Sequence, residues 1–548
     1  MKSLLLASTL LLAPAATLAA PAVDEARLNA HIKTLSSDAF EGRGPATEGE
    51  TKTVAYLTEQ MKAAGLEPGG DKGADGKRAW TQAVPLLRAE ITGTPKVSLN
   101  VAGSPQALTQ GEEIAVRAAL NGQKQVTIAD APLVFVGYGV TAPERNWDDF
   151  KGLDVKGKIL VVLVNDPDFE TQQGDFGGKA MTYYGRWTYK FEEAARKGAL
   201  GTLIVHETAP ASYGWATVKN SNTNTMFDIV RDDPAKAHAP LEAWIQRDLA
   251  VALFKASGLD FEDLKVKARA RDFQPVPLKA TISADFAVNS EVITSRNVVG
   301  RVTGKTRPDE TVLYTAHWDH LGVAAPDANG DTIYNGAVDN ATGTSALIEM
   351  GRAFAKAPRP ARSVVFLAVT AEEKGLLGSE FYAANPLYPL AKTAGVLNMD
   401  GFGVNGPARN FTISGTAELG LLDRLVAEGK KHNRVYSPDP RTEAGGFYRS
   451  DHFPFAKRGV PAISYGAGND LVDGGLARAE ELSKDYTAKR YHQPADEWSP
   501  DFNMKGLAAD IALLFDVGND LANSTDWPNW SANSEFRGTR DESAADRK

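Results

Sequence analysis

The stretch Thr311-Val-Leu-Tyr-Thr-Ala-His-Trp-Asp319 decides the fold of the second half of this 548-residue chain. Its apolar and β-branched beginning, residues 311–315, predicts a buried strand. His317 and Asp319 follow just past that strand, and side chains two residues apart on extended backbone point to the same side. The stretch therefore places an imidazole and a carboxylate together at the carboxyl end of a strand.

The same arrangement recurs along the chain after residue 298. Residues 363–369 and 395–399 predict two further strands, and a helix is predicted over residues 343–356. Carboxylates follow each strand or precede the helix: Asp339, Glu372, Glu373 and Asp400. Strands that alternate with helices predict βαβ units, and ligands of such sheets bind beyond the carboxyl ends of the strands. We therefore expect an α/β fold with a mixed, mainly parallel sheet sandwiched by helices.

The segment that precedes this region has a different sequence pattern. From about residue 83 to residue 295, short β-rich runs are divided by Gly, Pro and Asp turns, which is typical of a separate β-rich domain. The final residues are charged and poor in apolar side chains, which indicates a disordered tail. The predicted organisation is a signal peptide at 1–20, a discontinuous α/β domain at 21–110 and 285–530, an inserted β-rich domain at 111–284, and the tail at 531–548.

Composition excludes several classes of protein. The chain contains no cysteine, which rules out disulfides, thiolate metal ligands, a cysteine nucleophile and a lipoprotein anchor. Its net charge of −9 is accompanied by no basic stripe, so we expect no nucleic-acid partner. No segment after the N-terminus reaches the roughly 20 apolar residues that a membrane-spanning helix needs. A chain of this length is expected to form two or more domains.

The N-terminus has the pattern of a secretory signal. Lys2 supplies the positive charge, residues 4–12 the apolar core, and residues 17–20 the small-residue cleavage site, after Ala19 or Ala20. The apolar run is too short to span a bilayer. We therefore expect a periplasmic or secreted bacterial protein.

Histidines and carboxylates in this order are suited to binding metal. Zinc is held by imidazole nitrogens and carboxylate oxygens, and two zinc ions about 3.5–4 Å apart can share one bridging carboxylate. The candidate ligands are His317, Asp339, Glu373, Asp400 and His492. Asp339 can bridge two ions, Asp319 can accept the second ring N–H of His317, and Glu372 remains free to take a proton from water. Five metal ligands and one proton acceptor are the residues that a two-metal hydrolase needs.

Five short strings resemble the M28 family of zinc aminopeptidases. They are Ala316-His-Trp-Asp-His-Leu-Gly322, Asn335-Gly-Ala-Val-Asp-Asn-Ala-Thr-Gly343, Ala371-Glu-Glu-Lys-Gly375, Asn398-Met-Asp-Gly401 and Tyr491-His-Gln-Pro-Ala-Asp496. The motif Phe40-Glu-Gly-Arg-Gly44 is also typical of that family. The resemblance covers most of the chain after the signal, and the strings are specific in combination.

The resemblance implies a role for each candidate residue. It assigns one zinc to His317, Asp339 and Asp400, a second zinc to Asp339, Glu373 and His492, and the general base to Glu372. Tyr491 matches a residue that donates to the oxyanion in some members, although packing is an equally good interpretation of a tyrosine there. The string Ser450-Asp451-His452 is similar to a family motif near the pocket, with a structural or substrate-pocket role.

The β-rich segment resembles a protease-associated (PA) domain, as inserted in such peptidases. The residues that carry this likeness are Val136-Gly-Tyr-Gly139, residues 147–150, Val155-Lys-Gly-Lys-Ile-Leu-Val161 and Gly198-Ala-Leu-Gly-Thr-Leu-Ile-Val205. A domain of this kind usually covers or shapes the approach of substrate. The resemblance therefore implies a lid.

The expected function is an exopeptidase that removes N-terminal residues from peptides. The alternatives are a single-zinc glutaminyl cyclase-like transferase, a carboxypeptidase or dipeptidase on the same fold, and a binding module without catalysis. M20 peptidases share a similar ligand order, but they carry their extra domain between the later ligands, whereas here the insertion precedes His317. The sequence defines neither a side-chain specificity nor an oligomeric state.

Overall fold

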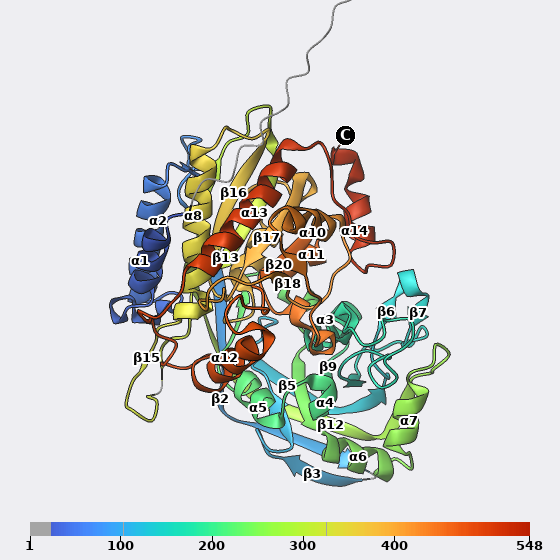
Figure 1. The fold of residues 1–548 in the computed structure, drawn as a ribbon. Helices are drawn as coiled ribbons and strands as arrows, with labels where there is room; N and C mark the ends of the chain where they lie inside the picture. Colours follow the sequence, from blue (N-terminus) through green and yellow to red (C-terminus); the bar gives the residue numbers. More distant parts are fainter. Residues whose placement is uncertain (1–22, 102, 325, 548) are drawn as a thin grey trace, which may run out of the picture.

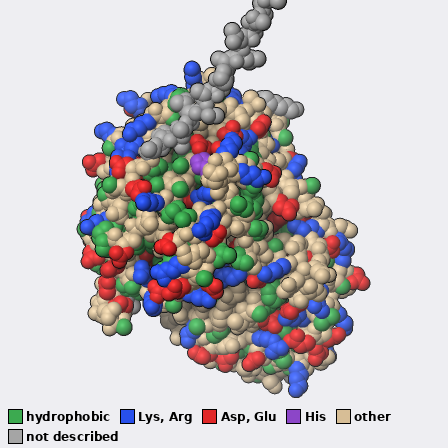
Figure 2. Space-filling model, in the orientation of Figure 1, with side chains coloured by type: hydrophobic (Ala, Val, Ile, Leu, Met, Phe, Trp, Pro, Cys, Tyr) green, Lys and Arg blue, Asp and Glu red, His purple; other side chains and the backbone are tan. Residues whose placement is uncertain are grey.

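The computed structural model describes residues 23–101, 103–324 and 326–547, so the predicted signal peptide lies outside the described residues. Figure 1 shows two lobes, an upper one that carries both ends of the described chain and a lower one built from residues in the first half. No helix among the described residues is both long and apolar enough to cross a lipid bilayer. On the face drawn in Figure 2, acidic and basic side chains are interspersed.

The upper lobe is built on four adjacent parallel strands. These are β13 (Arg307–His317), β16 (Arg362–Val369), β17 (Thr393–Met399) and β20 (Ala462–Gly466), in the spatial order β20-β17-β13-β16. Every residue of β16 and β17 is buried. Parallel strands covered on both faces have continuous apolar sequences, which explains why these strands do not alternate. The three strands predicted from sequence are confirmed.

Helices flank this sheet. Helices α8 (Thr342–Lys356) and α13 (Lys505–Asn523) contact β13 and β16, while α1 (Glu25–Leu35) and α2 (Glu48–Ala63) pack against α8. The Tyr314 ring stacks on Phe366, and its hydroxyl donates to the Leu514 carbonyl at 2.6 Å. Helices α10 (Gly420–Lys431) and α11 (Phe453–Lys457) complete the lobe. The prediction of a mixed sheet sandwiched by helices is confirmed.

Two long strands join the lobes into one sheet. Strand β2 (Thr81–Val101) pairs antiparallel with β12 (Val276–Val302) along almost its full length. At one end β12 pairs with β16, and at the other with β5 (Gln125–Phe135) of the lower lobe. The boundary predicted between residues 284 and 285 therefore falls inside a continuous strand.

The lower lobe has its own core. Strands β5, β8 (Ile159–Leu163), β9 (Gly201–His206) and β11 (Leu241–Gln246) are adjacent and parallel. Helices α3 (Trp187–Arg196), α6 (Arg247–Ala256) and α7 (Phe261–Lys267) pack around them. The main core of this lobe draws its residues from between Ala89 and Val288, so it is largely separate from the core of the upper lobe.

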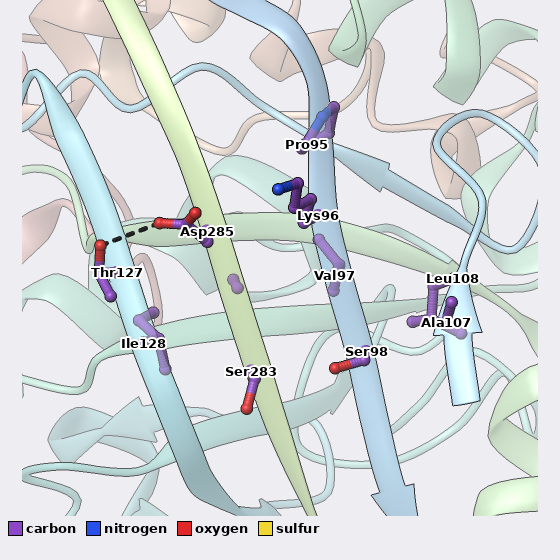
Figure 3. A pocket seen from close by; sticks show the side chains of 11 residues that line it. Pro95, Lys96, Val97, Ser98, Ala107, Leu108, Thr127, Ile128, Ser283 and Asp285 are labelled. Carbon is purple, nitrogen blue, oxygen red and sulfur yellow. Dashed lines mark hydrogen bonds between the residues drawn. The ribbon is translucent and has the colours of Figure 1, made fainter. Parts of the chain in front are cut away.

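A groove of about 420 Å³ lies on the sheet of the lower lobe (Figure 3). It is lined by residues of β2, β3 (Ser104–Leu108), β5 and β12, among them Lys96, Thr127 and Asp285. Thr127 donates a hydrogen bond to Asp285 there, at 3.1 Å. None of the site residues predicted from sequence lines this groove.

The C-terminal tail differs from its prediction, because it is folded. Residues Arg537–Glu542 form helix α14, and Arg540 is 1% exposed and donates to the Thr393 carbonyl at 3.1 Å. Phe536 is 5% exposed and lies 5.0 Å, centroid to centroid, from the ring of Trp530. The low average content of apolar residues predicted disorder, because an average gives no weight to single buried side chains such as Phe536 and Arg540.

Replacing Phe536 with alanine tests whether the tail belongs to the fold. We expect Phe536→Ala to lower the free energy of unfolding by about 3–5 kcal/mol, because it opens a cavity among buried aromatic rings. Chemical denaturation would measure the change, with the exposed Glu542→Ala in the same tail as the control. A Phe536→Ala protein as stable as the control would show that the tail contributes nothing to the fold.

Candidate metal centre

The predicted site residues lie where the parallel strands end. His317 is the last residue of β13, Asp400 directly follows β17, and the turn after β16 carries Glu372 and Glu373. Because β16, β13 and β17 are adjacent and parallel, their carboxyl ends share one edge of the sheet.

Two further residues reach this edge from other segments. Asp339 comes from the segment that leads into α8, and His492 follows helix α12 (Gly475–Lys489). The structure thus brings together all five ligands and the general base that were predicted from sequence.

The first group of donors surrounds His317. Its Nε2 lies 3.2 Å from Asp339 Oδ1 and 3.1 Å from Asp400 Oδ1. One donor atom from each of these residues lies within 4.8 Å of the other two. One imidazole nitrogen and two carboxylate oxygens at these separations can hold a single cation.

The second group lies on the other side of Asp339. Its Oδ2 is 3.3 Å from His492 Nε2, which is also 3.2 Å from Glu373 Oε2. Asp339 therefore directs one carboxylate oxygen to each group of donors. A carboxylate placed in this way can bridge two metal ions.

His320 is a residue that sequence reasoning missed. It is fully buried, its Nδ1 lies 2.7 Å from Glu373 Oε1, and with Asp339 and Glu373 it forms a second group of three donors. Its ring centroid lies 5.7 Å from that of His492. The signal was present as the second histidine of the string that begins at Ala316. The second group thus offers two imidazoles.

The site carries more negative than positive charge. Burial lowers the pKa of His317, but the carboxylates of Asp400 and Glu372 raise it well above its ordinary value. Burial also raises the pKa of Glu372 well above its usual range, and Asp400 adds to that increase. Within the described residues, His320 Nε2 is buried without a hydrogen bond, and His320 Nδ1 and Glu373 Oε1 are buried 2.7 Å from each other without hydrogen-bond geometry. Buried donor atoms and excess carboxylates both fit a bound cation.

Asp319 acts differently from its prediction. His317 Nδ1 is 3.1 Å from the backbone carbonyl of Asp319, whereas the Asp319 carboxylate is 3.7 Å away. That carboxylate instead accepts the backbone N–H groups of Glu372, at 3.1 Å, and Glu373, at 3.4 Å. The turn after β16 leaves these N–H groups without strand partners, so a buried carboxylate binds them. Asp319 therefore holds the turn that carries Glu372 and Glu373.

Three more side chains hold the ligand-bearing segments, and of these only Ser450 lies in a string that was predicted to be near the pocket. The Asp496 carboxylate accepts the backbone N–H groups of Val338 and Asp339. Ser450 Oγ donates to Asp400 Oδ2 at 2.6 Å, so the Ser450-Asp451-His452 string contacts the site. Arg43 is the third of these side chains, and it donates to backbone carbonyls of the ligand-bearing segments.

Arg43 lies in the motif Phe40–Gly44 and is 1% exposed. Its guanidinium donates to the carbonyls of Trp318, Leu35, Asn335 and Gly336, at 2.6 to 2.8 Å. Two of these carbonyls precede Asp339 by a few residues, and one lies between His317 and Asp319. A single buried cation thus ties the two ligand-bearing loops to helix α1.

Tyr491 lies beside the second group of donors. Its ring stacks on His492 with centroids 4.0 Å apart, and its side chain is 47% exposed. Stacking supports the position of His492. The suggested contact with an oxyanion stays a prediction.

A sheet whose parallel strands end in a cluster of imidazoles and carboxylates is typical of metal-dependent enzymes of the α/β class. Residues 297–514 match the model of peptidase family M28.

Named relatives share the same region. A probable zinc metalloprotease from Leptosphaeria maculans is 30% identical over 212 residues, which cover 32% of this chain and 47% of the relative. A glutamate carboxypeptidase 2 homolog from Caenorhabditis briggsae is 30% identical over 213 residues, or 32% of this chain and 25% of its own length. The chain thus spans less than half the length of these curated relatives.

Among solved structures, the aminopeptidase from Aneurinibacillus sp. strain AM-1 is similar over 92% of this chain and 95% of its own, at 18% identity and a TM-score of 0.48. The glutaminyl cyclase from an Acidobacteriales bacterium is similar over 42% of this chain and 75% of its own, at 20% identity and a TM-score of 0.30.

Replacing Asp319 with asparagine tests its role in holding the turn. We expect Asp319→Asn to weaken zinc binding about 10–100-fold, because an amide NH₂ would face a backbone N–H and release the segment of Glu373. Competition with a chromogenic chelator would measure the affinity. Asp309→Asn, an exposed carboxylate at the start of β13, is the control. Unchanged zinc affinity in a folded Asp319→Asn protein would contradict this role.

Proposed function

We propose that this protein is an exported exopeptidase that holds two zinc ions and removes N-terminal residues from peptides. The observation that carries the proposal is the position of Asp339, which directs one oxygen toward His317 and the other toward His492. A carboxylate shared between two groups of donors is the arrangement of a two-metal hydrolase.

Each zinc ion would take donors that lie around Asp339. His317, Asp339 and Asp400 would hold one ion, and Asp339, Glu373 and His492 would hold the other. His492 is preferred to His320 because its Nε2 is nearly equidistant from Asp339 and Glu373, at 3.3 and 3.2 Å. His320 approaches Glu373 at 2.7 Å and would hold that carboxylate in place.

Bound zinc would lower the pKa of a coordinated water and polarise the carbonyl of the peptide bond. Glu372 is not needed as a ligand, and its neighbour Glu373 faces the second group of donors. Glu372 would take the proton from water and pass it to the departing amine. Its buried surroundings favour the protonated form between these two transfers, because burial raises its pKa.

The choice between cutting at the N-terminus and cutting at the C-terminus of the peptide is inferred from the family resemblance. Removal of N-terminal residues is proposed on that ground, and the glutamate carboxypeptidase 2 homolog names the competing possibility of cutting at the C-terminus. A panel of peptides blocked at one end or the other distinguishes the two. Export to the periplasm or the medium is proposed from the N-terminal charge, apolar run and small-residue site.

The variant Glu372→Gln tests the chemistry. It keeps the size of the side chain but cannot accept a proton, so we expect kcat to fall about 10²–10⁴-fold with zinc content unchanged. Peptide hydrolysis and metal content would be measured on the same sample, with the exposed Glu418→Gln as the control. Full activity in Glu372→Gln would rule out this residue as the general base.

The count of zinc ions tests the ligand sets. We expect two zinc ions per chain in the purified holoenzyme, one in His492→Ala and two in His320→Ala, because His492 Nε2 lies within 3.3 Å of both Asp339 and Glu373, whereas the short contact of His320 is with Glu373. Mass spectrometry of the bound metal would give the counts. If His320→Ala lost an ion and His492→Ala did not, His320 would be the ligand. One ion in the parent protein would favour the single-zinc transferase.

A further inference from the structure

A further group of metal-binding donors lies between two helices that flank the sheet of the upper lobe. Glu428 and His432 come from the C-terminal end of α10, and Asp516 comes from α13. One donor atom from each of these residues lies within 4.8 Å of the other two. None of the three belongs to either group of donors around Asp339. The group is therefore a separate candidate site.

Helix geometry places two of the donors on one face of α10. The backbone N–H of His432 donates to the Glu428 carbonyl at 3.2 Å, so the helical turn continues as far as the histidine. Side chains four residues apart in a helix lie one above the other. The Asp516 carboxylate approaches from α13, with its Oδ2 2.8 Å from His432 Nε2. One imidazole and two carboxylates at these separations can surround a single cation.

Buried contacts hold the two helices beside this group of donors. Helices α10 and α13 contact one another along the upper lobe (Figure 1). Arg434, two residues beyond His432, forms a buried ion pair with Asp510 of α13. The Tyr465 hydroxyl donates to the same carboxylate at 2.7 Å. Because both backbones are held in place, the donors need little rearrangement to close on an ion.

The charges around the donors favour a cation. Among the described residues, the one lysine or arginine paired with these carboxylates is Lys431, 2.6 Å from Glu428 Oε2. The Lys431 side chain is 70% exposed, and such a pair adds little stability. The arginine of α10, Arg424, pairs instead with Asp520 and Asp526. A positive charge at the C-terminal end of a helix is also favoured by the helix dipole.

We propose that Glu428, His432 and Asp516 bind one divalent transition-metal ion, such as zinc, and that this ion links α10 to α13. An imidazole ligand favours zinc over calcium and magnesium, which prefer oxygen ligands. The side chains of His432 and Asp516 are 24% and 23% exposed, so water completes the coordination. The site therefore holds its ion less tightly than the buried metal centre and is filled after it. This inference goes beyond the proposed function and does not depend on it.

Titration of the purified holoenzyme with zinc tests the site. We expect the parent protein to take up one further zinc ion per chain in equilibrium dialysis, counted by mass spectrometry. His432→Ala and Asp516→Asn should bind that ion at least about 10–100-fold more weakly, because loss of even an outer partner of a ligand costs this much. Asp423→Asn, an exposed carboxylate of α10 outside the group of donors, is the matched control and should bind it normally.

Uptake is counted from the metal content of the dialysed holoenzyme. The result is therefore independent of how many ions the metal centre holds.

Thermal unfolding tests whether the ion links the helices. Excess zinc should raise the Tm of the parent and of Asp423→Asn by about 1–3 °C, because a ligand that binds only the folded state stabilises it, and calcium should not. His432→Ala should lose this rise and retain the peptide hydrolysis of the parent. The site would be overturned if the parent took up no further zinc, or if His432→Ala bound the further ion as tightly as the parent. Equal uptake of calcium would overturn the assignment to a transition metal.

Discussion

Mutual repulsion among buried carboxylates is the constraint on which the rest of this structure depends. Asp339, Glu373 and Asp400 reach the same few ångströms around two histidines, with Glu372 beside them. Two like charges 4 Å apart repel by about 4 kcal/mol at the effective dielectric of a protein surface. Such a cluster is stable only if a cation lies within it and if the backbone prevents the carboxylates from separating.

The frame that prevents separation consists of parallel strands and buried side chains that bind backbone groups. Adjacent strands place His317, Asp400 and the turn of Glu372 at one edge of the sheet. Asp319 and Asp496 then accept N–H groups from the loops that carry the ligands, and Arg43 donates to carbonyls of two such loops. Each of these side chains satisfies the hydrogen bonds of backbone groups that would otherwise be buried without partners.

The sequence predicted the strand ends and the ligand order because both depend on local patterns. Apolar runs followed by a carboxylate are visible along the chain, and the parallel sheet brings them together. The contacts of Asp319, Arg43 and Asp496 could not be predicted, since each joins segments far apart in sequence. His320 was not predicted as a metal ligand because His317 and Asp319 already explained the metal-binding pattern of residues 316–322. The folded tail was missed because average composition says little about single anchors such as Phe536.

The ladder shared by β2 and β12 has a mechanical consequence. The backbone pairing runs without a gap from the upper lobe into the lower one, and the register shifts once along it. Two bodies joined in this way cannot swing about a loose peptide hinge; they can move only by bending and twisting a stiff ribbon. Displacement of one lobe relative to the other is then small and elastic, and a distortion at one end of the ladder is transmitted to the other end.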